Sequence, residues 1–195
     1  ADTARGARHF MEDVCRLVRG RIRLARGDLR GALEDAAADV ELGRQQQAPE
    51  ALQAALALHA HALLVTGSVG EASARAGELL ALLAEQGVLV TNPDWSGVLA
   101  LVLHDLGRGA ELMELVAQVT PPTPWLQAAT AVASGDFERA AELYGDIGSL
   151  PDEAFTRLRA ARRLLDAGHR TDADGDQDDQ RQDLELHIAP SAFRV

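Results

Sequence analysis

Hydrophobic residues recur every three to four positions from near residue 10 to near residue 168, and short breaks containing Gly or Pro interrupt them. Apolar residues at this spacing share one face of an α-helix, whereas those of a half-buried strand alternate with polar ones. The breaks separate successive amphipathic segments, as turns between helices do. The pattern therefore predicts an all-α fold of about nine or ten antiparallel helices.

Five of these breaks contain a glycine and together define a repeat register. A glycine can adopt the left-handed backbone that ends one helix, and an aspartate directly after it can cap the next, as Asp28 and Asp136 could. The intervals are 40, 40, 28 and 33 residues, near the period of about 34 expected of a repeat built from two helices. The marker glycines are Gly27, Gly67, Gly107, Gly135 and Gly168.

Small side chains occupy two positions of the same register. Paired helices approach to about 8–10 Å only where their facing side chains are small. The register therefore predicts five closely packed helix pairs. Seven residues before the markers stand Gly20, Ala60, Ala100, Ala128 and Ala161, and five residues after them stand Ala32, Ala72, Leu112, Ala140 and Ala173.

The segment Gly-Asp-Phe-Glu-Arg-Ala-Ala-Glu-Leu-Tyr at 135–144 resembles the turn and second helix of a tetratricopeptide repeat. Ala140 and Tyr144 stand at the small and aromatic positions of that motif. The general resemblance covers about residues 10–170 and implies a right-handed solenoid of about five helix pairs over residues 1–170. Stacking of neighbouring pairs would stabilise it, because a lone pair leaves its apolar face uncovered.

The continuation at 145–168 is similar to the C-terminal helical arrays of actinobacterial signalling and transcriptional regulators, in which a cyclase-like or ATPase module precedes such repeats. The nucleotide chemistry of that group belongs to the upstream domains. The resemblance therefore implies a regulatory or protein-binding module and carries over no catalytic residue.

Two stretches depart from the repeat. The Pro-rich break at 121–124 predicts a shortened helix beginning at Trp125. Beyond Gly168 the expected second helix gives way to Asp and Gln, so residues 171–195 are predicted to be an acidic tail that is disordered or loosely packed. Either the array is truncated there, or the tail folds over its exposed end.

Composition and charge narrow the class of partner. The chain has 36 Ala, 29 Leu and no Lys, and its net charge of −11 argues against direct binding of nucleic acid. The charge is uneven, with a local +4 over residues 1–31 and a local −5 over residues 171–183. Five arginines at spacings of three to four are predicted to share one solvent-exposed or inter-domain helix flank, a phosphate contact being the alternative. They are Arg16, Arg19, Arg23, Arg26 and Arg30.

The sequence contains no complete motif for catalysis or metal binding. A phosphate loop needs Lys, and neither His-Glu-x-x-His nor Gly-x-Ser-x-Gly occurs. An EF-hand counted from Asp172 would need Gly and Glu where Gln177 and Asp183 stand, which leaves an irregular calcium site as the alternative to a solvated tail. Cys15 is predicted to be buried and inert. We therefore expect no catalytic residue, no metal, no cofactor and no enzyme activity.

The first helix of each tetratricopeptide unit lines a concave groove, so the register gives candidate partner-binding residues. Trp125 is the most specific of them as an aromatic anchor, although it could instead fill the gap left by the short repeat. Trp95 is expected to pack at the start of its helix on the preceding pair. The groove candidates are Leu17, Arg21, His61, His104, Asp105, Trp125, Leu158 and Arg162.

These observations favour a non-catalytic module that binds a protein or peptide segment, or an upstream domain of the same polypeptide, in a helical groove. The alternative is a helical domain that senses a small molecule. A closed apolar pocket would favour the sensor, and an open groove lined by Trp125 and Arg162 would favour peptide binding. The single cysteine and the absence of a signal peptide or an apolar run long enough to span a membrane predict a cytoplasmic protein.

Overall fold

The computed structural model describes residues 2–86 and 94–167, and it is helical, with no strand in these two ranges. The predicted all-α class is therefore confirmed. A last helix occupies residues 150–167 and completes nine helices within the described parts of the chain. The others are α1 (Asp2–Ala25), α2 (Leu29–Gln46), α3 (Pro49–Val65), α4 (Val69–Gln86), α5 (Asp94–Asp105), α6 (Gly109–Val116), α7 (Pro124–Ser134) and α8 (Phe137–Ile147).

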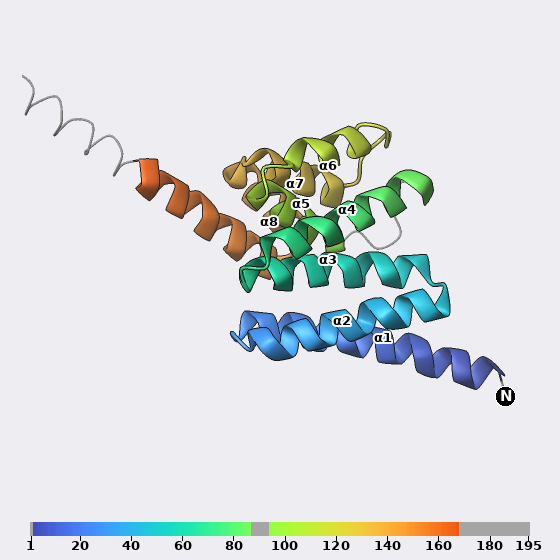
Figure 1. Cartoon of the computed structure of the whole chain (residues 1–195). Helices are drawn as coiled ribbons and strands as arrows, with labels where there is room; N and C mark the ends of the chain where they lie inside the picture. Colours follow the sequence, from blue (N-terminus) through green and yellow to red (C-terminus); the bar gives the residue numbers. More distant parts are fainter. Residues whose placement is uncertain (1, 87–93, 168–195) are drawn as a thin grey trace, which may run out of the picture.

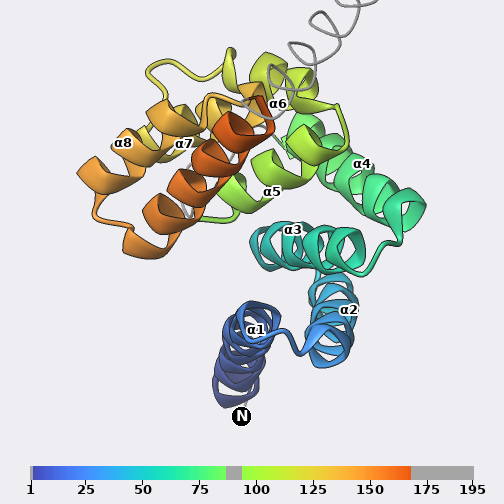
Figure 2. The same cartoon turned by 90° about the vertical axis from the view of Figure 1, so that its left-hand side faces the viewer.

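The helices pack in chain order. Each odd-numbered helix from α1 to α5 contacts the helix that follows it and also the next odd-numbered helix. Figure 1 shows α1, α2 and α3 side by side at one end of the molecule, with α5 to α8 at the other. In Figure 2 the helices follow a curved path from α1 through α3 to α5, and the last helix (orange) lies across from α1.

The predicted turns are confirmed wherever the structure describes them. Gly27, Gly67, Gly107 and Gly135 all have positive φ, between 70° and 85°, and Gly168 lies outside the described residues. Gly135 is also restricted by space, because a Cβ there would lie 2.8 Å from the His104 ring. The side chains of Asp28 and Asp136 cap the helices that follow, accepting hydrogen bonds from the third residue beyond each.

The predicted small positions lie mostly in helix contacts. Four of the five before the markers are buried, and Leu112 takes its place in the core among the alanines after them. Ala161 is the exception, since it is exposed on the last helix and no described helix covers that face. Ala173, its expected counterpart, lies outside the described residues, as does the predicted acidic tail.

The core runs along α3, α5 and α7. Fully buried leucines such as Leu56, Leu99 and Leu103 alternate with alanines that let the helices approach closely. Trp95 is 6% exposed at the start of α5, as predicted. The shortened α7 begins at Pro124 with Thr123 as its cap, one residue before the predicted start.

The contact between α1 and α2 contains buried charge. The Arg19 guanidinium donates two hydrogen bonds to the Asp35 carboxylate at 2.6 and 2.8 Å, and Arg23 donates a third at 2.9 Å. The predicted common arginine flank is wrong, because α1 ends at Ala25 and Arg30 belongs to α2. The arginines that meet Asp35 join two helices.

Cys15 corrects a second expectation. It is exposed, on a face of α1 that no described helix covers. Met11, Val18 and Ile22 share this face and are each about half exposed. The apolar run predicted a buried helix side, but within the described residues α1 packs mainly against α2 and α3, on its other sides.

Candidate functional site: an apolar groove

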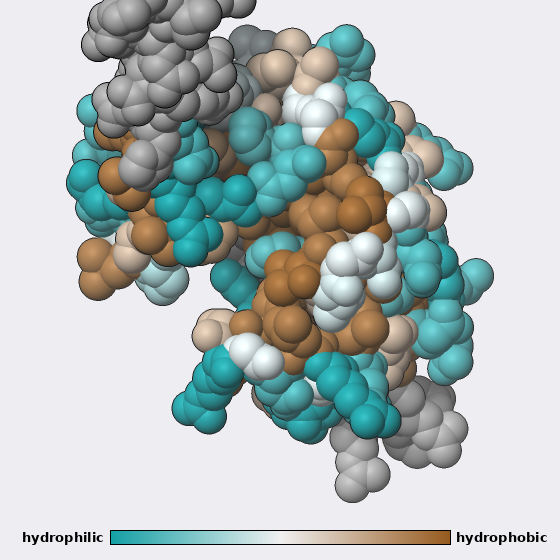
Figure 3. All heavy atoms as spheres, turned by 60° about the vertical axis from the view of Figure 1, so that its left-hand side comes forward, coloured by the Kyte–Doolittle hydropathy of each residue, from teal (hydrophilic) through white to brown (hydrophobic). Residues whose placement is uncertain are grey.

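A groove of about 390 Å³ opens between α1 and the last helix, and α3 and α5 form its floor with single side chains from α7 and α8. Figure 3 shows an apolar hollow on this side of the molecule. Odd-numbered helices thus supply most of its lining, because consecutive odd-numbered helices lie side by side on the inner side of the curve in Figure 2.

The floor is fixed by packing and the rim is open to solvent. Leu58, Leu101 and Val132 are no more than 5% exposed and form the floor. Val65 at 48% and Phe155 at 40% exposure line the rim, although both are large apolar side chains. Exposed apolar groups that gather around a hollow are typical of surfaces that bind a ligand or a partner.

The Tyr144 side chain reaches α5 at Gly97 and shapes the floor. Gly97 on α5 has no side chain, and a Cβ there would lie 2.3 Å from the Tyr144 hydroxyl oxygen. The Tyr144 ring from α8 therefore enters the groove wall where another residue on α5 would exclude it. Burial raises the pKa of Tyr144, so its hydroxyl stays protonated and can donate a hydrogen bond at neutral pH.

The groove holds few charged groups. Burial and, to a smaller extent, the positive charge of Arg159 together lower the pKa of His61 to about 4, so the imidazole on the floor is neutral at pH 7. Arg21 lines the α1 side, and Asp152 lines the opposite side, where it accepts a hydrogen bond from the Ser149 hydroxyl at 2.5 Å. An occupant thus meets an apolar, uncharged floor between one basic and one acidic rim.

Two predicted partner-binding residues, Arg21 and His61, line this groove together. Leu17 lies beside it, lining a small crevice that also contains Arg21. Leu158 and Arg162 are exposed on the last helix but do not line the groove.

The other three candidates hold helices together. The His104 ring lies edge-on to Phe137, with centroids 5.0 Å apart. Asp105 accepts two hydrogen bonds from Arg159, at 2.6 and 2.9 Å, and so ties α5 to the last helix. Trp125 packs against Tyr144 with centroids 6.0 Å apart, in keeping with the gap-filling role weighed for it above.

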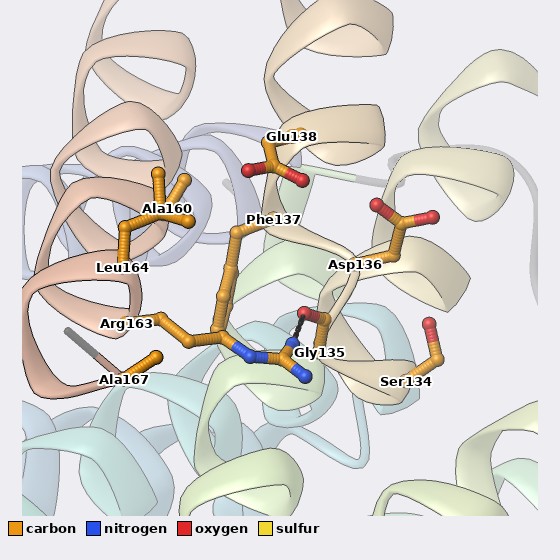
Figure 4. A pocket seen from close by; sticks show the side chains of 9 residues that line it. All are labelled: Ser134, Gly135, Asp136, Phe137, Glu138, Ala160, Arg163, Leu164 and Ala167. Carbon is orange, nitrogen blue, oxygen red and sulfur yellow. Dashed lines mark hydrogen bonds between the residues drawn. The ribbon is translucent and has the colours of Figure 1, made fainter. Parts of the chain in front are cut away.

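A second hollow lies between the α7–α8 turn and the last helix (Figure 4). Two of its polar groups already have partners: Arg163 donates a hydrogen bond to the Gly135 carbonyl oxygen, and Asp136 caps α8. This hollow therefore serves to hold the last helix against the turn.

Sequence reasoning missed the apolar rim and a buried acid pair. Val65 and Phe155 look like core residues in the periodicity, but the packing of the helices leaves both substantially exposed. Asp13 and Asp39 are 6% and 1% exposed, respectively, and share a hydrogen bond across α1 and α2. Burial, followed by the Asp13 charge, raises the pKa of Asp39 to about 8.

Within residues 2–86 and 94–167, no group of three or more His, Cys, Asp or Glu side chains is placed to hold a metal ion. The helices described there include none with the length and apolar character needed to cross a membrane. The acidic stretch weighed as a calcium site lies outside the described residues. Comparisons with protein families, with curated proteins and with solved structures gave no match.

Proposed function

We propose that the chain is a tetratricopeptide-like helical array that binds a partner segment in its concave groove and has no catalytic role of its own. The order of helix contacts supports the array, because α1, α3 and α5 each meet both their own second helix and the first helix of the next pair. The left-handed turn glycines and the buried small residues at fixed offsets support it further.

One observation carries the binding role. Val65 and Phe155, two large apolar side chains, remain substantially exposed at the rim of a groove whose floor is apolar. Covering such a surface releases water and stabilises a complex by about 25 cal/mol per Å² of apolar area. The proposed partner is a short segment with apolar side chains directed at the floor.

A helical domain that senses a small molecule remains a second candidate because of the lining and the volume of the groove. Neither Trp125 nor Arg162 lines the groove, whose volume of about 390 Å³ is within the range of ligand pockets. Its wide opening along the concave face favours an extended segment. A cyclase or ATPase domain on the same polypeptide, in a cytoplasmic regulator, is the setting that the resemblance at 145–168 suggests.

A peptide library displayed on phage and selected on the whole chain tests the proposal. Two valines provide a matched pair: Val65 lines the groove at 48% exposure, and Val69, at 53%, does not line it. Selected peptides should bind Val65→Asp at least about tenfold more weakly than the wild type, because the substitution places a charge on an apolar contact. They should bind Val69→Asp as the wild type does. Equal binding to all three proteins would contradict the proposal.

A further inference from the structure

The last helix carries an apolar face on the side away from its neighbours. Leu150, Leu158 and Leu165 are 72%, 51% and 62% exposed, and Ala154 and Ala161 between them are exposed as well. Steps of four, four, three and four residues place all five on one stripe of the helix. Figure 1 shows this helix in orange, projecting from the body at the opposite end from α1.

The opposite side of the same helix is used for packing within the chain. Thr156 is 3% exposed there. Arg159 binds Asp105, and Arg163 binds the Gly135 carbonyl, so the orientation of the helix is fixed. The apolar stripe is therefore held outward, where the second helix of a complete repeat would lie.

The order of large and small residues along the stripe is the same from both ends: Leu, Ala, Leu, Ala, Leu. An antiparallel copy of this helix that places Leu150 opposite Leu165 and Ala154 opposite Ala161 has its centre between Arg157 and Leu158, so the two Leu158 side chains lie next to one another across it. The two alanine positions would let the helix axes approach, and the leucines would fill the space on either side. Such self-complementarity is what a two-fold interface requires, since the same patch serves both subunits.

We propose that two copies of the chain associate through this stripe, with the last helices antiparallel about a two-fold axis between Arg157 and Leu158. The proposal is independent of the groove, because Phe155 and Asp152 point to a different side of the helix. The charged residue at the edge of the stripe does not prevent the two helices from pairing. Arg157 at the edge is already bound by Glu153 of its own helix at 2.8 Å.

Other occupants are less well matched to the stripe. Residues 169–183 contain a single apolar residue, Ala173, so the leucines nearest to the stripe along the chain, Leu184 and Leu186, come only after this acidic stretch. The exposed face of α1, with Met11, Cys15 and Val18, could meet the stripe of another copy only head to tail. That contact does not close and would give chains that lengthen with concentration.

Sedimentation equilibrium of the full chain over a wide range of concentration tests the proposal. One helix face is small for an interface, so we expect a monomer–dimer equilibrium in the micromolar range that stops at the dimer. Leu158→Glu and Leu158→Arg should each weaken association at least about tenfold, because like charges then face one another across the axis. An equimolar mixture of the two variants should associate again, as unlike charges meet.

Adjacent leucines provide a control. Leu164 and Leu165 have almost the same exposure, 63% and 62%, but only Leu165 belongs to the stripe. Leu165→Glu should weaken the dimer clearly more than Leu164→Glu.

Two results would overturn the proposal. One is assembly beyond the dimer that Val18→Glu abolishes, since it would indicate the head-to-tail contact. The other is a wild type that stays monomeric throughout; if Leu158→Glu then speeds amide exchange of residues 150–167, the chain's own C-terminal segment covers the stripe.

Discussion

Two neighbouring parts of this all-helical structure are stabilised by different chemistry. Between α1 and α2, buried Asp35 is held by two arginines, and Asp13 and Asp39 share a hydrogen bond out of water. Along α3, α5 and α7, leucines and alanines pack with almost no buried charge. Small residues therefore set how closely the helices approach, and the remaining side chains decide how each contact responds to pH and salt.

This difference bears on the groove, because its walls come from both parts. α1 supplies Arg21 and Leu24, whereas α3 and α5 supply Leu58 and Leu101. One wall is thus attached through ionisable groups and the floor through apolar packing. Substitutions in the two parts should differ in size and in their dependence on pH.

The largest effect is expected in the apolar stack. Leu99 on α5 is fully buried, and Leu99→Ala removes its packing and leaves a cavity. We expect the free energy of unfolding to fall by about 2–5 kcal/mol. Denaturant unfolding should give the same loss at pH 6.5 and at pH 8. Asp39 ionises over this range, because its pKa is about 8. A loss that varied between these pH values would show that this contact is not purely apolar.

Asp35→Asn should have an intermediate effect. The Arg19 guanidinium hydrogen-bonded to Asp35 holds the pKa of this carboxyl below its usual value, so the charged form stabilises the fold above about pH 4 and the benefit is lost as pH falls. Removing the charge should cost about 1–2 kcal/mol at neutral pH. The loss should shrink in high salt, because Arg19 is partly exposed. A salt-independent loss would point to packing as the cause.

Asp39→Asn, four residues further along α2, should act in the opposite sense. The pKa of Asp39 is raised from about 3.9 in an unfolded chain to about 8 in the fold, so the folded state binds the extra proton and wild-type stability declines as pH rises between these values. An amide keeps a hydrogen-bond donor toward Asp13 without ionising. The variant should therefore be more stable than the wild type above about pH 8.

Melting temperatures above about pH 6.5 give the clearest comparison for Asp39, because His61 has its pKa lowered to about 4 and contributes a rise of stability with pH only below that range. The wild type should lose stability from about pH 6.5 to about pH 8, and Asp39→Asn should lose much less. Parallel curves would contradict the shared-proton account of Asp13 and Asp39.

The smallest effect is expected at the rim of the groove. Val65 ends α3 and is about half exposed, so Val65→Asp should change the free energy of unfolding by no more than about 0.5 kcal/mol. Thermal unfolding beside Val69→Asp checks this. A large loss would mean that Val65 supports the fold, and its effect on binding could then not be assigned to the groove.

The turns and spacings of the fold could be predicted from sequence because they depend on local chemistry. A left-handed turn requires a residue such as Gly135, and a capping aspartate lies next to it in the chain. The predictions that Cys15 and Ala161 are buried were wrong for the same reason. Periodicity shows which side of a helix is apolar but not whether another helix covers it. Cys15 lies on the first described helix and Ala161 on the last.

The groove was harder to predict than the fold. Arg21 and His61 were found because they are polar residues at groove positions of the register. Val65 and Phe155 were missed because an apolar residue facing a hollow has the same sequence pattern as one facing the core. The rotation and curvature of the stacked helices, which decide between the two, depend on contacts distant in sequence.

Methyl NMR of the full chain, titrated with a peptide selected from the library, tests the central claim most directly. The account predicts that the methyl signals of Leu58, Val98 and Leu101 on the groove floor shift on binding, while those of Leu158 and Leu165 on the outer stripe do not. Shifts confined to the outer stripe, or to neither surface, would contradict the claim that the concave groove is the binding site.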